Sequence, residues 1–321
     1  MEEIAKQEFV DELCLNILPF WINNVIDTDN GGFVGRISGN GDKHADAPKG
    51  AILNARILWT FSAAYRLFNK PEYLETATRA KEYLLTYFWD NEQGGIFWQL
   101  AADGTPLDKK KQIYAQGFAI YGLSEYARAT GDSDALEKAV ELYQLIEKYS
   151  FDQNLNGYQE AFTGEWGEIA DVRLSDKDAN EKKTMNTHLH ILEPYTNLYR
   201  IWPTAELKNS LRNLIELFLD KILAPSGHLQ LFFDEQWHNK QNIFSYGHDI
   251  EASWLLYEAA VVLGETDLTD RVIAVIPAIV KAASEGLQSD GSLIYEKNLA
   301  TGHIDSDRHW WVQAEAVVGF W

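Results

Sequence analysis

The sequence has little cysteine, little positive charge and no long apolar run. Cys14 is the only cysteine in 321 residues, which excludes an intrachain disulfide and a thiolate metal cluster. Lysine and arginine total 28 against 48 aspartates and glutamates, and the net charge is −20, so nucleic acid and anionic membranes are poor partners. No apolar run reaches the length of a membrane span. A neutral ligand is the simpler expectation.

The N-terminus also lacks the pattern of a secretory signal. Residues 1–13 (MEEIAKQEFVDEL) are acidic and amphipathic, without a basic segment followed by an apolar core. We therefore expect a cytoplasmic protein. Because 46% of the residues are hydrophobic, the chain can bury a full core.

A glycine-centred segment recurs along the chain. Each copy has an Asp or Ser, then a glycine, then residues that favour strands, as in DNEQGGIFWQL (90–100). The central glycines, spaced by 63, 62, 70 and 64 residues, are Gly32, Gly95, Gly157, Gly227 and Gly291. Glycine readily adopts the positive φ of a tight turn. We predict a short hairpin at each of these positions.

Between the turns, apolar residues recur at helical spacing. Each segment predicts one helix that is apolar on nearly all sides and a second helix with a charged face. The predicted pairs are 52–68 with 71–88, 114–130 with 133–149, 186–202 with 204–223, and 247–263 with 267–287. Pro71 suits the first turn of its helix, and Ser133 or Asp134 is the expected cap of another.

Pairs of one buried and one exposed helix build concentric rings. We therefore expect an all-α fold, an (α/α)6 toroid with short β-hairpins between helix pairs, as a single domain over residues 1–321. A leading helix at about 4–25 would be an outer member. A fifth inner helix begins near residue 308 and reaches Trp321 without a stop signal. We expect the domain to be C-terminally incomplete, without the fifth outer helix, the sixth hairpin and the last inner helix.

Polar and aromatic residues stand in the first turns of the predicted inner helices. They are Arg56, Tyr114, Gln116, Asn186, His188, His190, His248, Glu251, Trp310, Trp311, Gln313 and Glu315. Each one alone could be structural, as a histidine at the edge of a core or a carboxylate favoured by a helix dipole. Such residues recur near the starts of all five predicted inner helices, each of which forms one sector of the ring. This recurrence favours one shared pocket at the centre of the ring.

Aromatic faces with arginine, asparagine and carboxylates suit a neutral sugar. A metal site is not expected, because His188 and His190 point in different directions on a helix and no His-Glu-x-x-His pattern occurs. No glycine-rich phosphate loop and no Gly-x-Ser-x-Gly elbow occurs. Glycoside hydrolysis by two carboxyl groups and proton transfer beside a carbonyl remain. The pocket is richer in histidine than in aspartate, which favours proton transfer.

Four segments resemble the cellobiose 2-epimerase family, within the N-acylglucosamine 2-epimerase superfamily of (α/α)6 barrels. They are YAQGFAIYGLSEYARATGD (114–132), NTHLHILEPYTNLYRIWP (186–203), FSYGHDIEASWLLYEAA (244–260) and WWVQAEAVVGF (310–320). The resemblance implies reversible epimerisation at C2 of the reducing-end glucose of a β-1,4-linked disaccharide. Cellobiose would become glucosyl-mannose and lactose would become epilactose, through a cis-enediolate and without metal or nucleotide cofactor.

The resemblance also implies residue roles. His248 matches one of two acid/base histidines, and Arg56 and His190 match residues beside the enediolate oxygen. The full catalytic set is His248, His190, Arg56 and Glu251, and the substrate-binding set is Tyr114, Asn186, Trp310, Trp311 and Glu315. In this set the two tryptophans form an indole platform under the disaccharide. His188 is expected to be structural.

The family's second acid/base histidine lies in the sixth hairpin region, beyond residue 321. We therefore expect little or no epimerase activity from residues 1–321, and an active complete parent protein. The alternatives are a mannose isomerase or N-acylglucosamine 2-epimerase, a glycoside hydrolase on an α/α toroid, and a non-catalytic sugar-binding protein. The expected partner is a small-molecule disaccharide, and the expected state is a monomer or a weak homodimer.

Overall fold

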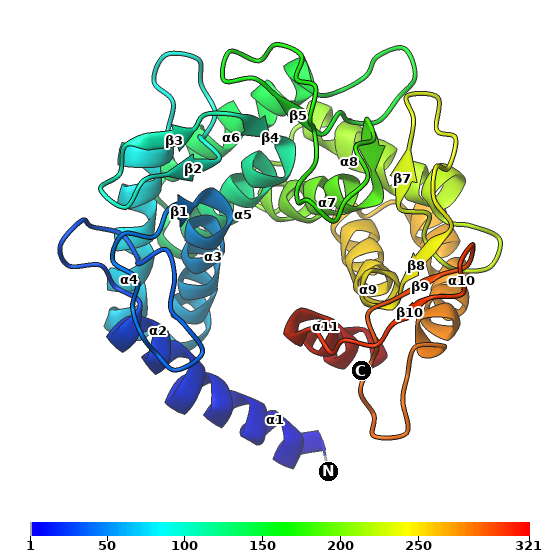
Figure 1. Ribbon diagram of the computed structural model, residues 1–321, viewed down its shortest axis with the longest axis horizontal. Helices are drawn as coiled ribbons and strands as arrows, with labels where there is room; N and C mark the ends of the chain where they lie inside the picture. Colours follow the sequence, from blue (N-terminus) through cyan, green and yellow to red (C-terminus); the bar gives the residue numbers. More distant parts are fainter. Residues whose placement is uncertain (1) are drawn as a thin grey trace.

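A computed structural model describes residues 2–321, whose helices form two concentric layers (Figure 1). The inner layer consists of α3 (Ala51–Phe68), α5 (Ile113–Thr130), α7 (Met185–Tyr199), α9 (Tyr246–Leu263) and α11 (Trp310–Phe320). The outer layer contains α4 (Pro71–Tyr83), α6 (Ser133–Tyr149), α8 (Ala205–Leu217) and α10 (Thr266–Ser284). The predicted α/α toroid is confirmed. Within residues 2–321, no helix has the length and apolarity that a membrane crossing requires.

The leading helix is interrupted by a wider turn. It runs from α1 (Glu2–Asp11) through a π-helical segment, η1 (Glu12–Ile17), to α2 (Leu18–Asn24). Two outer helices end in the same way, α4 with η2 (Leu84–Phe88) and α8 with η3 (Phe218–Ile222). Figure 1 shows α1 extending away from the ring.

The predicted glycine turns are all present. Their central glycines have φ between 61° and 90° and are Gly32, Gly95, Gly157, Gly227 and Gly291. One antiparallel bridge closes each turn, and the bridged pairs are Ile26–Phe33, Trp89–Ile96, Phe151–Tyr158, Leu223–Leu229 and Leu287–Leu293. The local hairpins are thus only one bridge long.

The longer strand pairings join neighbouring sectors. The strand before an inner helix pairs with the strand after the next turn. The pairs are β1 (Lys49–Gly50) with β2 (Gln99–Leu100), β4 (Lys111–Gln112) with β5 (Ala161–Phe162), β6 (Lys183–Thr184) with β7 (Phe232–Phe233), and β8 (Ile243–Ser245) with β9 (Glu296–Asn298). Two of these sheets gain a third strand, β3 (Pro106–Asp108) or β10 (Ile304–Asp305). These ladders connect successive helix pairs.

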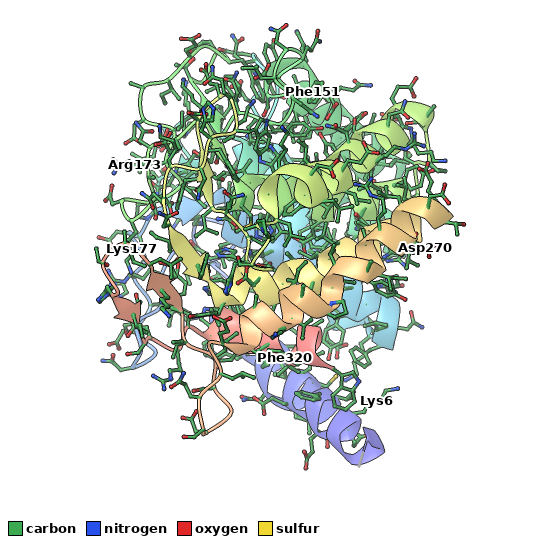
Figure 2. All side chains as sticks on the ribbon, turned by 90° about the vertical axis from the view of Figure 1, so that its right-hand side faces the viewer. Lys6, Phe151, Arg173, Lys177, Asp270 and Phe320 are labelled. Atoms are coloured by element: carbon green, nitrogen blue, oxygen red, sulfur yellow. The ribbon has the colours of Figure 1, made fainter. Side chains whose placement is uncertain are left out.

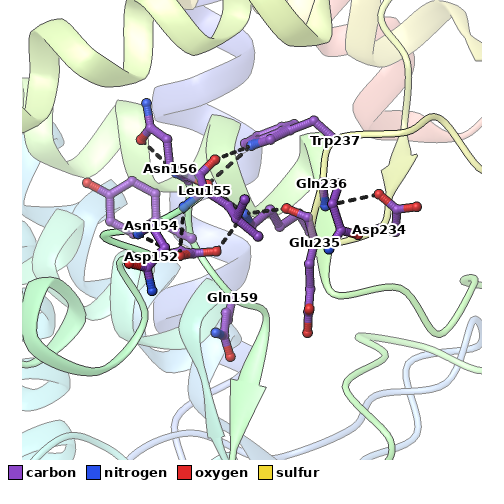
Figure 3. Close-up of polar contacts among 12 residues, drawn as sticks. Asp152, Asn154, Leu155, Asn156, Gln159, Asp234, Glu235, Gln236 and Trp237 are labelled. Atoms are coloured by element: carbon purple, nitrogen blue, oxygen red, sulfur yellow. Dashed lines mark hydrogen bonds and ion pairs between the residues drawn. The ribbon is translucent and has the colours of Figure 1, made fainter.

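A buried ion pair lies beneath three of the turns. The pairs, with N–O distances of 2.8, 2.7 and 2.9 Å, are Lys49–Asp27, Lys111–Asp90 and Lys183–Asp152. Lys183 Nζ also donates to the backbone carbonyls of Asn156 and Glu235. Figure 3 shows the segments around Asp152, Asn156 and Glu235 that supply these oxygens. These partners offset the cost of burying a charged amine. The fourth sector contains a different buried pair, His228 and Asp249, with Nδ1 2.7 Å from Oδ2.

The predicted cap of α6 is wrong by one or two residues. Asp132, rather than Ser133 or Asp134, is the N-cap, and its side chain accepts from the backbone N–H of Ala135. Asp132 also pairs with Lys81 of the neighbouring outer helix at 2.9 Å. A contact between helices therefore helps to select the cap, and sequence spacing does not reveal such a contact.

Alanine at Gly157 should destabilise the protein strongly. Gly157 has φ of +88°, and an added Cβ would lie 2.3 Å from Cζ2 of Trp237. The left-handed backbone and the overlap together should lower the free energy of unfolding by about 2–5 kcal/mol. Gly131→Ala is the matched control, because Gly131 has φ of +77° with no neighbour within 4 Å. Urea unfolding measures both variants, and equal losses would contradict the role of the overlap.

Candidate active site

All inner helices begin at the end of the ring that carries the short strands. Figure 2 shows Arg173 and Lys177 at this end, and Asp270, near the start of outer helix α10, at the opposite end. Inner and outer helices therefore run in opposite directions. The first turns of the inner helices surround the axis at one end of the molecule.

The fourth residue of an inner helix holds the neighbouring turn. In α5, Gln116 Oε1 accepts from the backbone N–H of Ile96 at 2.8 Å, and Gln116 Nε2 donates to the Ile96 carbonyl at 2.9 Å. Corresponding bonds to backbone N–H groups, at 2.9, 2.8 and 2.9 Å, join His188 to Tyr158, Asp249 to Leu229 and Gln313 to Leu293. This geometry agrees with a structural role for His188. It also gives Gln116 and Gln313 a structural role, although the sequence places them beside the pocket residues.

Most of the inner-helix residues that line a central cavity stand at the second or sixth position of their helix, whereas His248 is the third residue of α9 and Trp310 the first of α11. Residues four apart lie on one face of a helix, which separates these positions from the fourth. The cavity has a volume of about 340 Å³. Its lining contains all nine predicted site residues, namely Arg56, Tyr114, Asn186, His190, His248, Glu251, Trp310, Trp311 and Glu315. The structure thus brings the predicted set together, and the role of each residue stays a prediction.

His190 is buried between aromatic rings and carboxyl groups. Its ring centroid lies 4.8 Å from that of Tyr114 and 5.1 Å from that of Phe118. His190 Nδ1 lies 3.1 Å from Glu193 Oε2, and Nε2 lies 3.7 Å from Glu251 Oε1. Burial lowers the pKa of His190, and the hydrogen bond to Glu193 opposes this effect.

Arg56 brings a positive charge to the same wall of the cavity. Its guanidinium carbon lies 4.2 Å from the centroid of the Phe118 ring, and Nη2 donates to the Tyr114 hydroxyl at 3.3 Å. Burial raises the pKa of Tyr114 to about 12, although Arg56 opposes this shift. Arg56 itself remains exposed to the cavity. Its charge is therefore available to an anionic oxygen on a ligand.

His248 is the third residue of α9 and faces Trp311. The two ring centroids are 4.8 Å apart, and Nδ1 lies 2.7 Å from the Ser245 hydroxyl. Burial, with a smaller contribution from His190, lowers the pKa of His248 to about 3. The imidazole is therefore neutral at pH 7. If its Nδ1–H donates to Ser245, Nε2 keeps a lone pair that can accept a proton.

Two carboxyl groups of the cavity have pKa values above their ordinary range. Burial and the charges of Glu315 and Glu193 raise the pKa of Glu251 well above its ordinary value. Burial raises the pKa of Glu315 to about 7, although Trp254 Nε1 donates to this carboxyl group at 2.9 Å. Burial therefore favours the protonated, hydrogen-bond-donating form of Glu251, and Glu315 is partly protonated near neutral pH.

The sequence analysis missed the segment 171–181, which forms part of the cavity wall. Its lining residues are Val172, Arg173, Leu174, Ser175, Asp178, Ala179 and Glu181. Asn180 holds this segment together, because its side chain accepts from Val172 N at 3.0 Å and donates to Ala170 O at 2.9 Å. The segment contains no helix or strand, so periodicity gives no signal for it.

Other missed residues lie at the starts of short strands. Glu296 is the first residue of β9, Tyr295 precedes it, and Glu160 precedes β5; all three line the cavity. Across residues 2–321, no three His, Cys, Asp or Glu side chains form a group that could hold a metal ion. The expectation of a reaction without metal or nucleotide cofactor stays a prediction.

Residues 31–321 match the N-acylglucosamine 2-epimerase (GlcNAc 2-epimerase) family. The chain belongs to this family. It is 62% identical to the cellobiose 2-epimerase of Bacteroides fragilis, over 100% of this chain and 82% of that protein. The solved structure of cellobiose 2-epimerase from Bacillus thermoamylovorans superposes with a TM-score of 0.93 at 43% identity, over 100% of this chain and 81% of that one.

A solved D-mannose isomerase shares the fold at greater distance. Its TM-score is 0.81 at 21% identity, over 94% of this chain and 76% of that one, which shows likeness of fold alone. The family and the two cellobiose 2-epimerases make this protein an isomerase of the epimerase type. This agrees with the resemblance found in the sequence.

The buried carboxyl group of Glu160 predicts a pH dependence of stability. It accepts from Thr184 N at 2.8 Å and from the Thr187 hydroxyl at 2.6 Å. Burial raises its pKa from the ordinary 4.5 to about 8. The folded state therefore binds this proton more tightly than the unfolded chain does. The resulting stabilisation is complete below pH 4.5 and is lost as the pH rises through about 8.

Glu160→Gln should remove this part of the pH dependence, because glutamine stays uncharged. Between about pH 5 and 9, we expect the variant to lose less free energy of unfolding than the unsubstituted protein. Urea unfolding at several pH values measures this difference. Parallel stability curves for the two proteins would contradict the raised pKa.

Proposed function

We propose that the cavity catalyses reversible epimerisation at C2 of the reducing-end glucose of β-1,4-linked disaccharides. Cellobiose would become glucosyl-mannose, and lactose would become epilactose. The observation that carries this proposal is the neutral imidazole of His248, which shares one sugar-sized cavity with the guanidinium of Arg56. The 62% identity to a protein named cellobiose 2-epimerase supports the choice of substrate.

In this proposal His248 removes the proton at C2 after the sugar ring opens. A hydrogen beside a carbonyl is acidic because the resulting negative charge spreads onto oxygen. The low pKa of His248 makes it a weak base in the empty cavity. Negative charge that develops on the substrate raises the proton affinity of the imidazole as the proton moves. A base that is uncharged at neutral pH is ready for this step.

Arg56 and His190 would stabilise the enediolate oxygen. Arg56 supplies a fixed positive charge, and His190 faces the cavity from the neighbouring sector. The carboxyl group of Glu251, 3.7 Å from His190 Nε2, adds a hydrogen-bond donor in its protonated form, which burial favours. Donors and charges placed beforehand cost little reorganisation when negative charge develops.

Aromatic and amide groups would bind the rest of the sugar. Trp311 and the more exposed Trp310, at 76% relative exposure, offer indole faces to the C–H face of a sugar ring. Asn186 Oδ1 is buried without a hydrogen-bond partner among the described residues, so it can accept from a sugar hydroxyl. Tyr114 and Glu315 supply further polar contacts.

Inversion at C2 requires a proton from the opposite face of the enediolate. The family resemblance assigns this step to a second histidine, in a region that follows residue 321. We therefore propose that the polypeptide 1–321 exchanges the C2 proton with solvent but forms little or no epimer.

Heavy water tests this proposal directly. Residues 1–321 incubated with lactose in D2O should return lactose that carries deuterium at C2, with little or no epilactose, as measured by NMR and chromatography. Full turnover to epilactose would contradict the requirement for a second histidine.

Other products in the same assay would identify the alternatives. Released monosaccharide would indicate a glycoside hydrolase, and reaction of mannose or N-acylglucosamine alone would indicate a related isomerase. Binding of cellobiose without any exchange would indicate a sugar-binding protein.

Replacing His248 should abolish most of the exchange. We expect His248→Asn to slow incorporation of deuterium at C2 by about 100- to 10,000-fold, because a general base contributes factors of this size. The control is His303→Asn, which changes an exposed histidine outside the cavity lining. Equal rates for the two variants would show that His248 is not the base.

A further inference from the structure

We propose that Glu193 is a positioning residue that holds a proton on Nδ1 of His190 and thereby orients Nε2 toward the substrate. Glu193 is absent from the cavity lining and from the residues that the sequence singled out. The state of His190 follows from the geometry of the protein alone. Its catalytic consequence rests on the proposed function.

The geometry fixes which atom of the imidazole meets Glu193. The two residues are three apart on α7, so their side chains lie on the same face of the helix. Glu193 Oε2 lies 3.1 Å from Nδ1, at hydrogen-bond distance, whereas Nε2 faces the other way. A carboxylate oxygen only accepts hydrogen bonds, so Nδ1 must carry the hydrogen.

The surroundings keep the ring in this orientation. His190 is 4% exposed and packs against Phe118 and Tyr114, so the imidazole has little room to turn. Helix α5 approaches closely at Gly117, where an added Cβ would lie 2.4 Å from the carbonyl oxygen of His190. The backbone of His190 is therefore held as well as its ring.

A proton held on Nδ1 determines whether Nε2 accepts or donates a hydrogen bond. In the neutral ring, Nε2 has a lone pair that faces the cavity and the carboxyl group of Glu251, 3.7 Å away. When the ring gains a second proton, Glu193 stabilises the cation and Nε2–H becomes a donor to the substrate oxygen. Glu193 thus favours uptake of a proton by His190 as the enediolate forms nearby. The other titratable or charged groups near His190 are Arg56, Tyr114, His248 and Glu251.

NMR of the protein without sugar tests the first part. Imidazole ¹⁵N shifts, assigned by their loss in His190→Gln, should place the proton of His190 on Nδ1 in the unsubstituted protein. A proton on Nε2 in that spectrum would overturn the proposal, and this reading needs no variant of Glu193. In Glu193→Gln, the carboxamide can donate as well as accept, so the preference for Nδ1–H should weaken and the pKa of His190 should fall.

The rate of C2 exchange tests the catalytic part. We expect Glu193→Gln to lower the maximal exchange rate about 10- to 100-fold, with the KM nearly unchanged. The matched control is Glu141→Gln, which removes an i,i+3 carboxylate paired with Lys138 at 2.8 Å on outer helix α6. Glu193→Asp keeps a carboxyl group at this position. Compared with Glu193→Gln, it should recover part of the preference for Nδ1–H and part of the exchange rate.

The two measurements separate the possible failures. If the tautomer and pKa of His190 are the same in Glu193→Gln as in the unsubstituted protein, Glu193 is not a positioning residue. If they change while the exchange rate does not, the catalytic consequence is wrong. If the unsubstituted protein exchanges no proton with any sugar, the proposed function fails, and the ¹⁵N shifts still decide whether Glu193 holds the proton.

Discussion

One hydrogen bond in each of several sectors determines where the pocket side chains point. The fourth residue of inner helices α5, α7, α9 and α11 binds the backbone of a glycine turn. An α-helix rotates by about 100° per residue, so fixing the fourth position also fixes the directions of the second and sixth. An amide, an imidazole and a carboxylate all serve in this bond. The ring can therefore keep its geometry while the chemistry of the neighbouring positions differs from sector to sector.

The charge state of the pocket follows from burial. Burial keeps His248 neutral at neutral pH and favours the protonated form of Glu251, while the guanidinium of Arg56 stays exposed to the cavity. The region around these three residues therefore offers a cation and a carboxyl group that can donate a hydrogen bond. Such a site is prepared for negative charge that develops on a ligand, because water would otherwise have to reorganise around that charge.

Helical periodicity and recurrence were sufficient to predict the toroid, the helix pairs and a set of twelve candidate residues, and the family resemblance narrowed this set to the nine that meet at the centre. Periodicity alone could not separate Gln116, which holds a turn, from Arg56, which faces the cavity, because both stand near the start of an inner helix. Periodicity and resemblance also missed Glu193, whose importance depends on the ring nitrogen that it meets, and Asp132, whose partner Lys81 comes from another helix. Such contacts arise only when segments distant in sequence are packed together.

The connection between β5 and β6 is irregular, unlike the helices around it. Residues 163–182 contain no helix, and a ladder at each end ties them to the ring. Insertions or deletions in this stretch would leave the helix pairs in place, because surface connections tolerate changes of length. This part of the cavity wall can therefore diversify during evolution independently of the residues proposed for proton transfer. Homologues with one shared chemistry could in this way acquire different preferences for the size of the sugar.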